Sequence, residues 1–437
     1  MTTELLVMNK TAVALAADSA ITVTGKNKQK IYNTANKLFS LSTDCPVGIM
    51  IYGNAEINGV PWETIIKIYK NKFFKQQQET LDDYANNFIA FLNDNDGAMY
   101  KSMFPDEQQN FSFGVLVFRL FSNISKAINH ALNNMAGIAD EQTAANTTIR
   151  DEIIKATIKM YLKEYKSLSD LDGMTESFGK DVVEKYSEII QFCKEEVFKD
   201  QSISTELNDD LVELCAKLAH KDKFINPSGV VIAGFGELDV FPSYVYFTMD
   251  AVINNKLKYK KSNYISIDNI SNRSHLRPFA QSDTVSTFVF GIDPAYEDVI
   301  QGYMKDILTD SYPSKIIEEL NNLSETEKVS IRENLIISGN KIYKDFIEKC
   351  RDHCNEHHFE PITQALEFLP KDELATVAES LVNITSFMKR MSMEDETVGG
   401  PCDVAVISKG DGFIWIKRKH YFEVESNPQY LARYYKR

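Results

Sequence analysis

The sequence predicts an α+β fold, in which strand-rich segments alternate with helical ones along 437 residues. Three observations support this prediction. Short apolar runs bounded by polar turns open the chain, apolar residues spaced by three and four follow them, and strand patterns then return twice, after helical stretches. The expected order is therefore strands, helices, strands, helices and strands.

The chain opens with two short apolar runs, residues 4–7 and 11–17, separated by Asn9-Lys10. This pattern predicts two antiparallel strands joined by a tight turn. Residues 30–53 continue as strands, and the last of them is apolar enough to be buried on both faces. In residues 54–94, apolar residues spaced by three and four predict two amphipathic helices.

Residues 95–223 form a long, mainly helical segment. Within it, residues 113–121 are apolar and fit either a strand or a buried helix. We expect an extra helical layer, and the sequence leaves open whether it caps a site or contacts a partner. It contains no linker rich in Pro, Gly and Ser, which argues against a freely hinged domain.

Strand character returns in SGVVIAGFGE and PSYVYFTMDAV. Charged helices are then expected from Asp293-Pro294 to about residue 355, and the clear helical pattern KDELATVAESLVNITSFMKRM follows. Two final strands are predicted at residues 403–408 and 413–417, joined by a turn at Gly410-Asp411-Gly412.

Composition narrows the function without identifying it. The net charge of −14 argues against a general nucleic-acid binder, because no basic surface would offset phosphate repulsion. No apolar run approaches the length of a membrane span and no signal sequence opens the chain, so we expect a cytoplasmic protein without a membrane partner. Six widely scattered cysteines are expected to be reduced thiols.

One cluster of potential metal ligands lies in KCRDHCNEHH, where Cys350, Cys354 and His357 could share one helix face. Four ligands from a single helix are difficult to arrange around zinc, and no second Cys/His pair complements them. We therefore expect a polar helix end and no metal. No phosphate-binding loop or dinucleotide fingerprint is present, so no cofactor is expected.

The strongest chemical signal is Thr2, which directly follows the initiator Met. A terminal Thr can act as a nucleophile with its own α-amine as base, provided that the terminus is held still in a sheet. Lys37 would favour the developing alkoxide, Asp18 would hold Lys37, and the Gly53 N–H could face an oxyanion. Each residue alone fits an ordinary structural role, and their order and spacing carry the prediction.

At these residues the chain resembles the proteasome β-subunit family of N-terminal nucleophile hydrolases, which includes a related bacterial ring protease. The family pattern of Thr-Thr, Ala-Asp-Ser, Lys with two apolar residues, and a strand ending in Gly reads here as Thr2-Thr3, Ala17-Asp18-Ser19, Lys37-Leu38-Phe39 and Ile51-Tyr52-Gly53. The stretch from Asp18 to Lys37 is a few residues longer than in the family, and a hairpin loop at residues 25–30 would absorb the difference.

The resemblance implies an αββα four-layer sandwich formed by a single domain, residues 2–437. Its core would comprise residues 2–94 and 227–417, with the helical insertion 95–223 and extra helices at about 311–355. Further site residues are implied by position. Ser282 is nearest to the family's assisting Ser and Asp395 matches its Asp, whereas Val398 replaces a family Ser. The implied substrate pocket is apolar and is formed by Ile21, Ala35 and Ile51.

The function implied is a threonine-type amide hydrolase, most simply a peptidase acting on a polypeptide or amide substrate. Two alternatives remain. Val398 and the insertions also fit a catalytically silent structural subunit of a proteasome-like assembly, and the same terminus could serve a non-peptidase amidase. By analogy with the family we expect a homo-oligomeric ring, and an ATPase partner is compatible with it although no docking motif is present.

Overall fold

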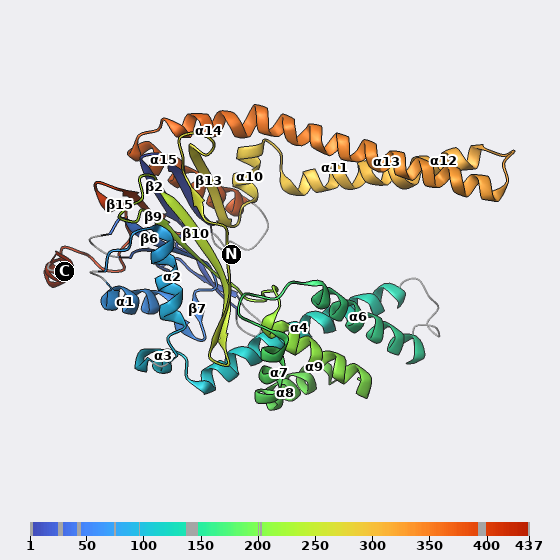
Figure 1. Cartoon of the computed structure of the whole chain (residues 1–437), viewed down its shortest axis with the longest axis horizontal. Helices are drawn as coiled ribbons and strands as arrows, with labels where there is room; N and C mark the ends of the chain where they lie inside the picture. The colour runs from blue at the N-terminus through green and yellow to red at the C-terminus, as the bar shows by residue number, and fades with distance from the viewer. Residues whose placement is uncertain are drawn as a thin grey trace. The chain divides into compact units, whose positions relative to one another are not determined.

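The computed structural model of the protein describes residues 3–24, 29–41, 45–73, 76–95, 97–136, 147–199, 201, 203–391 and 399–435 (Figure 1). The chain divides into two compact units, one formed by Met1–Leu38 with Ser266–Arg437 and the other by Phe39–Ile265. Antiparallel sheets and helices occur in both units. The predicted α+β class is therefore confirmed.

The first unit contains a five-stranded antiparallel sheet in the order β13-β1-β2-β14-β15. Asn9 Oδ1 accepts a hydrogen bond from Thr11 N at 2.9 Å and closes the predicted first turn. The two opening strands and the two closing strands are confirmed. The strands are β1 (Thr3–Asn9), β2 (Ala12–Ala17), β13 (Ser274–Ala280), β14 (Asp403–Ser408) and β15 (Gly412–Lys417).

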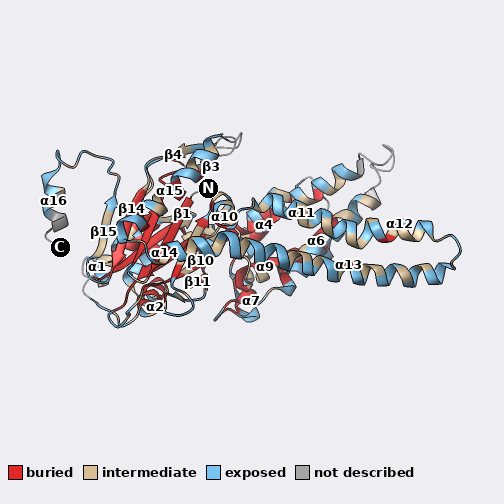
Figure 2. Ribbon diagram, turned by 90° about the horizontal axis from the view of Figure 1, so that it is seen from above, coloured by how far each residue is buried: buried red, intermediate tan, exposed pale blue. Residues whose placement is uncertain are grey.

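One face of this sheet is covered by α15 (Lys371–Met391), which packs on β1, β2 and β14. Alternate residues of the opening strands, such as Leu5 and Val7, join residues of α15 in one hydrophobic core. Helices α10 (Asp283–Phe290) and α14 (Glu360–Glu367) extend this core. Strands β1, β2 and β14 are buried along their whole length, whereas no residue of β15, at the edge of the sheet, is buried (Figure 2).

A long helical hairpin projects from the same unit (Figure 1). Its two sides pack together closely, because a Cβ added to Gly339 would lie 2.1 Å from the carbonyl oxygen of Leu308. The helices begin after Asp293, as predicted. They are α11 (Pro294–Asp306), the π-helix η1 (Ile307–Ser311), α12 (Tyr312–Glu319), α13 (Glu325–Cys354) and the π-helix η2 (Asn355–Phe359).

The second sheet lies mainly in the second unit and has the strand order β11-β10-β9-β6-β5, with β12 (Ile265–Ser266) beside β10. Both predicted amphipathic helices are confirmed, and they share a core with β6, β9 and β10. These elements are α1 (Trp62–Phe73), α2 (Leu81–Leu92), β5 (Leu38–Ser40), β6 (Val47–Gly53), β9 (Ser228–Gly234), β10 (Ser243–Ile253) and β11 (Lys256–Lys261).

The described part of residues 95–223 is mainly helical, and the ambiguous stretch 113–121 lies within a helix. A separate hydrophobic core holds the helices together. Tyr186 separates two of these helices. The helices are α3 (Ala98–Met103), α4 (Asp106–Ala136), α6 (Thr147–Ser167), α7 (Glu176–Lys185), α8 (Ser187–Phe198) and α9 (Thr205–His220).

Helix α4 corrects one expectation from the sequence. By length and composition alone, its stretch Asp106–Asn134 is apolar enough to cross a membrane. However, 44% of its apolar window is buried inside the protein. It packs against α6, α8 and β10, so its apolar residues serve the core of the helical layer.

The remaining described elements are short. The first unit holds a hairpin of β3 (Ile21–Thr24) and β4 (Gln29–Tyr32), and a C-terminal helix α16 (Pro428–Tyr435). The second unit holds a small hairpin of β7 (Glu56–Ile57) and β8 (Val60–Pro61).

Candidate functional site

Asp18 is the centre of a buried polar cluster in the first unit and is only 1% exposed. Its Oδ1 accepts hydrogen bonds from Thr3 N at 3.0 Å and from Lys37 Nζ. Its Oδ2 accepts from Ala20 N at 3.2 Å and from Gly399 N at 3.0 Å. A carboxylate offers about four acceptor positions, so these four donors use its whole capacity.

The register of the opening hairpin explains why Asp18 meets the start of β1. Glu4 pairs with Ala17, which places residue 18 opposite Thr3. Asp18 N also donates to Thr3 O at 3.1 Å, so main chain and side chain both hold the first described residue. The start of β1 is therefore fixed within the sheet.

Lys37 reaches the cluster because the β3–β4 hairpin leaves the sheet and returns beside its own starting point. Ala35 N donates to Ser19 O at 3.1 Å and closes the base of this excursion. Extra residues at the hairpin tip therefore do not displace Lys37. The lysine side chain is 8% exposed and forms an ion pair with Asp18.

Glu4 is a member of the cluster that the sequence analysis missed. It is fully buried, and its Oε1 lies 3.2 Å from Lys37 Nζ. Every residue of β1 is buried, and a buried carboxylate needs a charged or hydrogen-bonding partner. An acidic residue within a strand buried on both faces was the signal that could have identified it.

The turn before β14, the strand that borders β2 on the side opposite to β1, completes the cluster. Ser19 N donates to Gly399 O at 3.1 Å, and Ser19 Oγ donates to the carbonyl of Pro401. Gly400 has φ +76, and a Cβ there would lie 2.6 Å from Asn33 Cβ, so this position favours glycine. The glycine turn thereby brings the Gly399 N–H to Asp18.

The end of β13 lies beside the start of β1, because Ala280 is the register partner of Thr3. Ala280 has φ +60, an uncommon conformation for a residue with a side chain. Ser282 follows two residues later, half-buried at the start of α10, and its side chain makes no helix-capping hydrogen bond. Among the described residues, Thr3 Oγ1 is buried without a hydrogen-bond partner.

The other predicted site residues lie in different parts of the chain. Thr2, Asp395 and Val398 lie outside the described residues. Ile21 and Ala35 are half-buried, at the start of β3 and just after β4. Ile51 and Gly53 lie on β6 in the second unit, and Ile51 is buried.

Gly53 occupies a position that a larger residue would strain. Its φ is +75, and a Cβ there would lie 2.6 Å from Pro227 O. The structure thus explains the glycine by backbone geometry at the end of β6.

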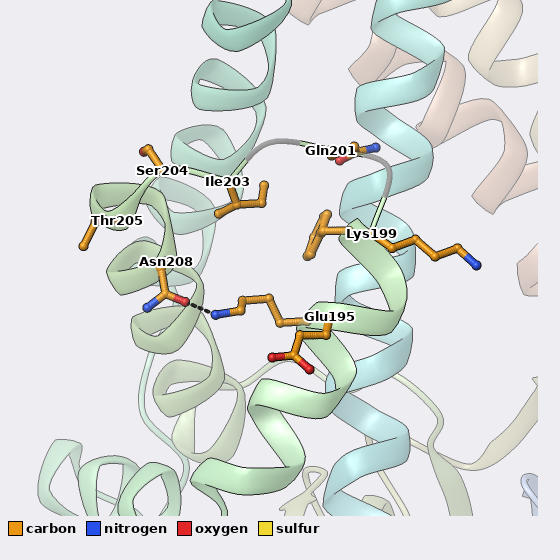
Figure 3. A pocket seen from close by; sticks show the side chains of 9 residues that line it. Glu195, Lys199, Gln201, Ile203, Ser204, Thr205 and Asn208 are labelled. Carbon is orange, nitrogen blue, oxygen red and sulfur yellow. Dashed lines mark hydrogen bonds between the residues drawn. The ribbon is translucent and has the colours of Figure 1, made fainter.

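A cavity of about 440 Å³ lies between α8 and α9 in the helical layer (Figure 3). Lys194, Glu195, Phe198 and Asn208 are among its lining residues, and Lys194 Nζ donates to Asn208 Oδ1. None of the residues predicted to carry chemistry lines it. It does not contribute to the cluster around Asp18.

The Cys/His segment at the end of α13 forms a ring contact, with His353 and His357 centroids 4.4 Å apart. Within the ranges that the structure describes, no group of three or more His, Cys, Asp or Glu side chains is arranged to hold a metal ion.

No protein-family model matches the chain, and no curated protein matches it. Any functional conclusion therefore depends on the residues and their geometry.

Proposed function

We propose that the protein is a threonine-type amide hydrolase, most simply a peptidase of the proteasome β-subunit kind, in which removal of Met1 exposes Thr2. The observation that carries this proposal is the buried Asp18–Lys37 pair at the first residue of β1. A buried lysine is costly unless it is paired, and Lys37 pairs with the carboxylate oxygen that also accepts from Thr3 N at the start of β1.

Covalent geometry supports the participation of Thr2. A peptide bond of about 1.33 Å joins residue 2 to Thr3 N. That nitrogen lies 3.0 Å from Asp18 Oδ1, the oxygen that Lys37 also contacts. The Lys37 ammonium donates to Asp18 Oδ1 and forms an ion pair with Glu4 Oε1 at 3.2 Å, and the proposal gives it Thr2 Oγ as a further partner.

In the proposed reaction, Thr2 Oγ attacks the scissile carbonyl while the Thr2 α-amine accepts the hydroxyl proton. Lys37 stabilises the negative charge on Oγ, and Asp18 orients Lys37. The C–N bond then breaks, the protonated α-amine gives its proton to the leaving amine, and water hydrolyses the acyl ester. The proposal keeps the Gly53 N–H as the oxyanion donor, with Ser282 and Asp395 assisting, as the sequence resemblance implies.

The proposal also includes the αββα sandwich, the apolar pocket of Ile21, Ala35 and Ile51, a cytoplasmic location and a homo-oligomeric ring. The sandwich is supported by two antiparallel sheets that each share a core with helices.

An active-site probe tests the proposal. Intact mass first establishes whether Met1 is removed, and an epoxyketone peptide is then expected to add to Thr2. Thr2→Ala and Lys37→Met should abolish the adduct, whereas Lys349→Met, which removes an exposed lysine of α13, should leave it unchanged.

A demethionylated protein that never forms the adduct would instead be a silent structural subunit. If labelling occurs, parallel assays of peptide and small-amide substrates distinguish a peptidase from an amidase.

A further inference from the structure

A second cavity lies beside the one described above, and the two cavities meet at one hydrogen bond. The smaller cavity has a volume of about 270 Å³ and lies among α4, α7, α8 and α9. Lys194 and Asn208 line both cavities, and Lys194 Nζ donates to Asn208 Oδ1. This hydrogen bond therefore lies at the junction between the two cavities.

The walls of the two cavities differ in character. The larger cavity carries mainly polar and charged side chains, including Ser204 and Thr205 at the start of α9 (Figure 3). An apolar compartment that adjoins a polar one suits an amphiphilic small molecule. The smaller cavity supplies the apolar compartment, with a wall formed mainly by Phe121, Val183, Ile190, Leu211 and Val212.

Lys194 gives the junction a positive charge. Its described partner is the neutral amide of Asn208, and no described carboxylate lies within ion-pair distance of its ammonium. Glu195, the carboxylate that lines the larger cavity, accepts instead from Gln191 Nε2 at 2.5 Å. An ammonium has three N–H groups, so the hydrogen bond to Asn208 leaves donors for a ligand.

We propose that these cavities bind a monocarboxylate with an aliphatic tail, in which the tail fills the smaller cavity and the carboxylate contacts Lys194. The charge of Lys194 selects an anion, because an ammonium and a carboxylate form a charge-assisted hydrogen bond. The start of α9 adds to this selection, since a helix N-terminus favours negative charge. The inference is independent of the hydrolase proposal, because it requires neither Thr2 nor the reaction assigned to it.

The volume of the smaller cavity limits the length of the tail. An apolar cavity of about 150 Å³ accommodates benzene. The smaller cavity, at about 270 Å³, is nearly twice as large and suits a tail of about eight carbon atoms. Octanoate is therefore the appropriate probe.

The test is isothermal titration calorimetry of the full chain with octanoate. We expect saturable binding of one octanoate per chain. Octylammonium has the same tail and the opposite charge, whereas acetate lacks the tail. Each of them should bind at least about tenfold more weakly than octanoate.

Two variants examine the two ends of the site separately. Lys194→Met removes the cation and should weaken octanoate binding at least about tenfold, while the binding of octan-1-ol, which depends on the tail alone, should not change. Val183→Trp, at a half-buried position of the wall, should fill the smaller cavity and weaken the binding of both ligands. Lys163→Met, which removes an exposed lysine of α6, is the matched control and should leave both affinities unchanged.

A measurement on the wild-type protein covers a variant that fails to fold. Lysines are acetylated by a short pulse of acetic anhydride and quantified by peptide mass spectrometry. Octanoate should slow the acetylation of Lys194 and leave that of Lys163 unchanged. Equal acetylation of Lys194 with and without octanoate, or equal affinity of the wild type and a folded Lys194→Met, overturns the proposal. Equal affinity for octanoate and octylammonium does so as well, because the charge of Lys194 would then play no part.

Discussion

Replacing Asp18 with Asn should destabilise the first unit strongly, although the two side chains have nearly the same shape. Both oxygens of Asp18 accept hydrogen bonds from two donors each. In Asn an NH2 group, which donates hydrogen bonds, replaces one of the two carboxylate oxygens. In either orientation of the side chain, two donors therefore lose their acceptor. One orientation turns the NH2 group toward Thr3 N and Lys37, and the other toward Ala20 N and Gly399 N.

The magnitude follows from the number of lost contacts. A buried donor left without an acceptor costs about 1–3 kcal/mol, and removal of one partner from a buried ion pair costs about 3–5 kcal/mol. These costs overlap because Lys37 retains Glu4. We therefore expect Asp18→Asn to lower the free energy of unfolding by about 3–5 kcal/mol and the Tm by about 10 °C.

Thermal unfolding by calorimetry measures this effect, and Asp411→Asn provides the matched control. Asp411 also binds a lysine, Lys371 at 2.6 Å, but its side chain is 57% exposed. An exposed pair contributes about 0–1 kcal/mol, so the control should unfold close to the wild type. If Asp18→Asn unfolds within 1 °C of Asp411→Asn, the four-donor description of Asp18 is wrong.

Three further changes probe other parts of the chain. Burial lowers the pKa of His275 to about 4, so between pH 4 and pH 6.5 the unfolded protein binds a proton at this residue and the native protein does not. The free energy of unfolding should therefore decrease below pH 6.5, by about 2 kcal/mol at pH 5. Thermal unfolding of His275→Gln at several pH values should not show this decrease. In the helical hairpin, Gly339→Ala should lower the Tm, because the added Cβ would lie 2.1 Å from a backbone oxygen. Gly302→Ala has open space around it and should raise the free energy of unfolding by up to about 1 kcal/mol. Equal Tm shifts of the two variants in calorimetry would contradict this packing. Cys350 is exposed, whereas Cys215 is buried and its burial raises the pKa of its thiol. Iodoacetamide at pH 8 should therefore modify Cys350 in the native protein and Cys215 only after unfolding. Mass spectrometry of the peptides measures both modifications.

The sequence predicts the parts of the cluster that depend on local chain geometry. A turn after Asn9 pairs the first two strands, and that register alone places Asp18 opposite Thr3. Lys37 was also predictable, because a hairpin between it and Asp18 returns the chain to its starting point regardless of the length of the hairpin tip.

Contacts between distant segments could not be predicted in this way. Gly399 N reaches Asp18 across 381 positions of sequence, and no local pattern specifies that approach. Strand β11 was missed because KLKYKK suggests a solvated segment. Its Lys258 is fully buried and lies 3.4 Å from Asp250 Oδ2 on the neighbouring strand β10, so an ion pair between two adjacent strands overrides the composition.

The hydrogen bonds of Asp18 limit its role in the proposed reaction. Because four donors saturate Asp18, this carboxylate can fix the start of β1 and orient Lys37, but it has no position left at which to accept a proton from a nucleophile. Any proton taken from Thr2 must therefore go to another group. In the proposed site that group is the α-amine of Thr2.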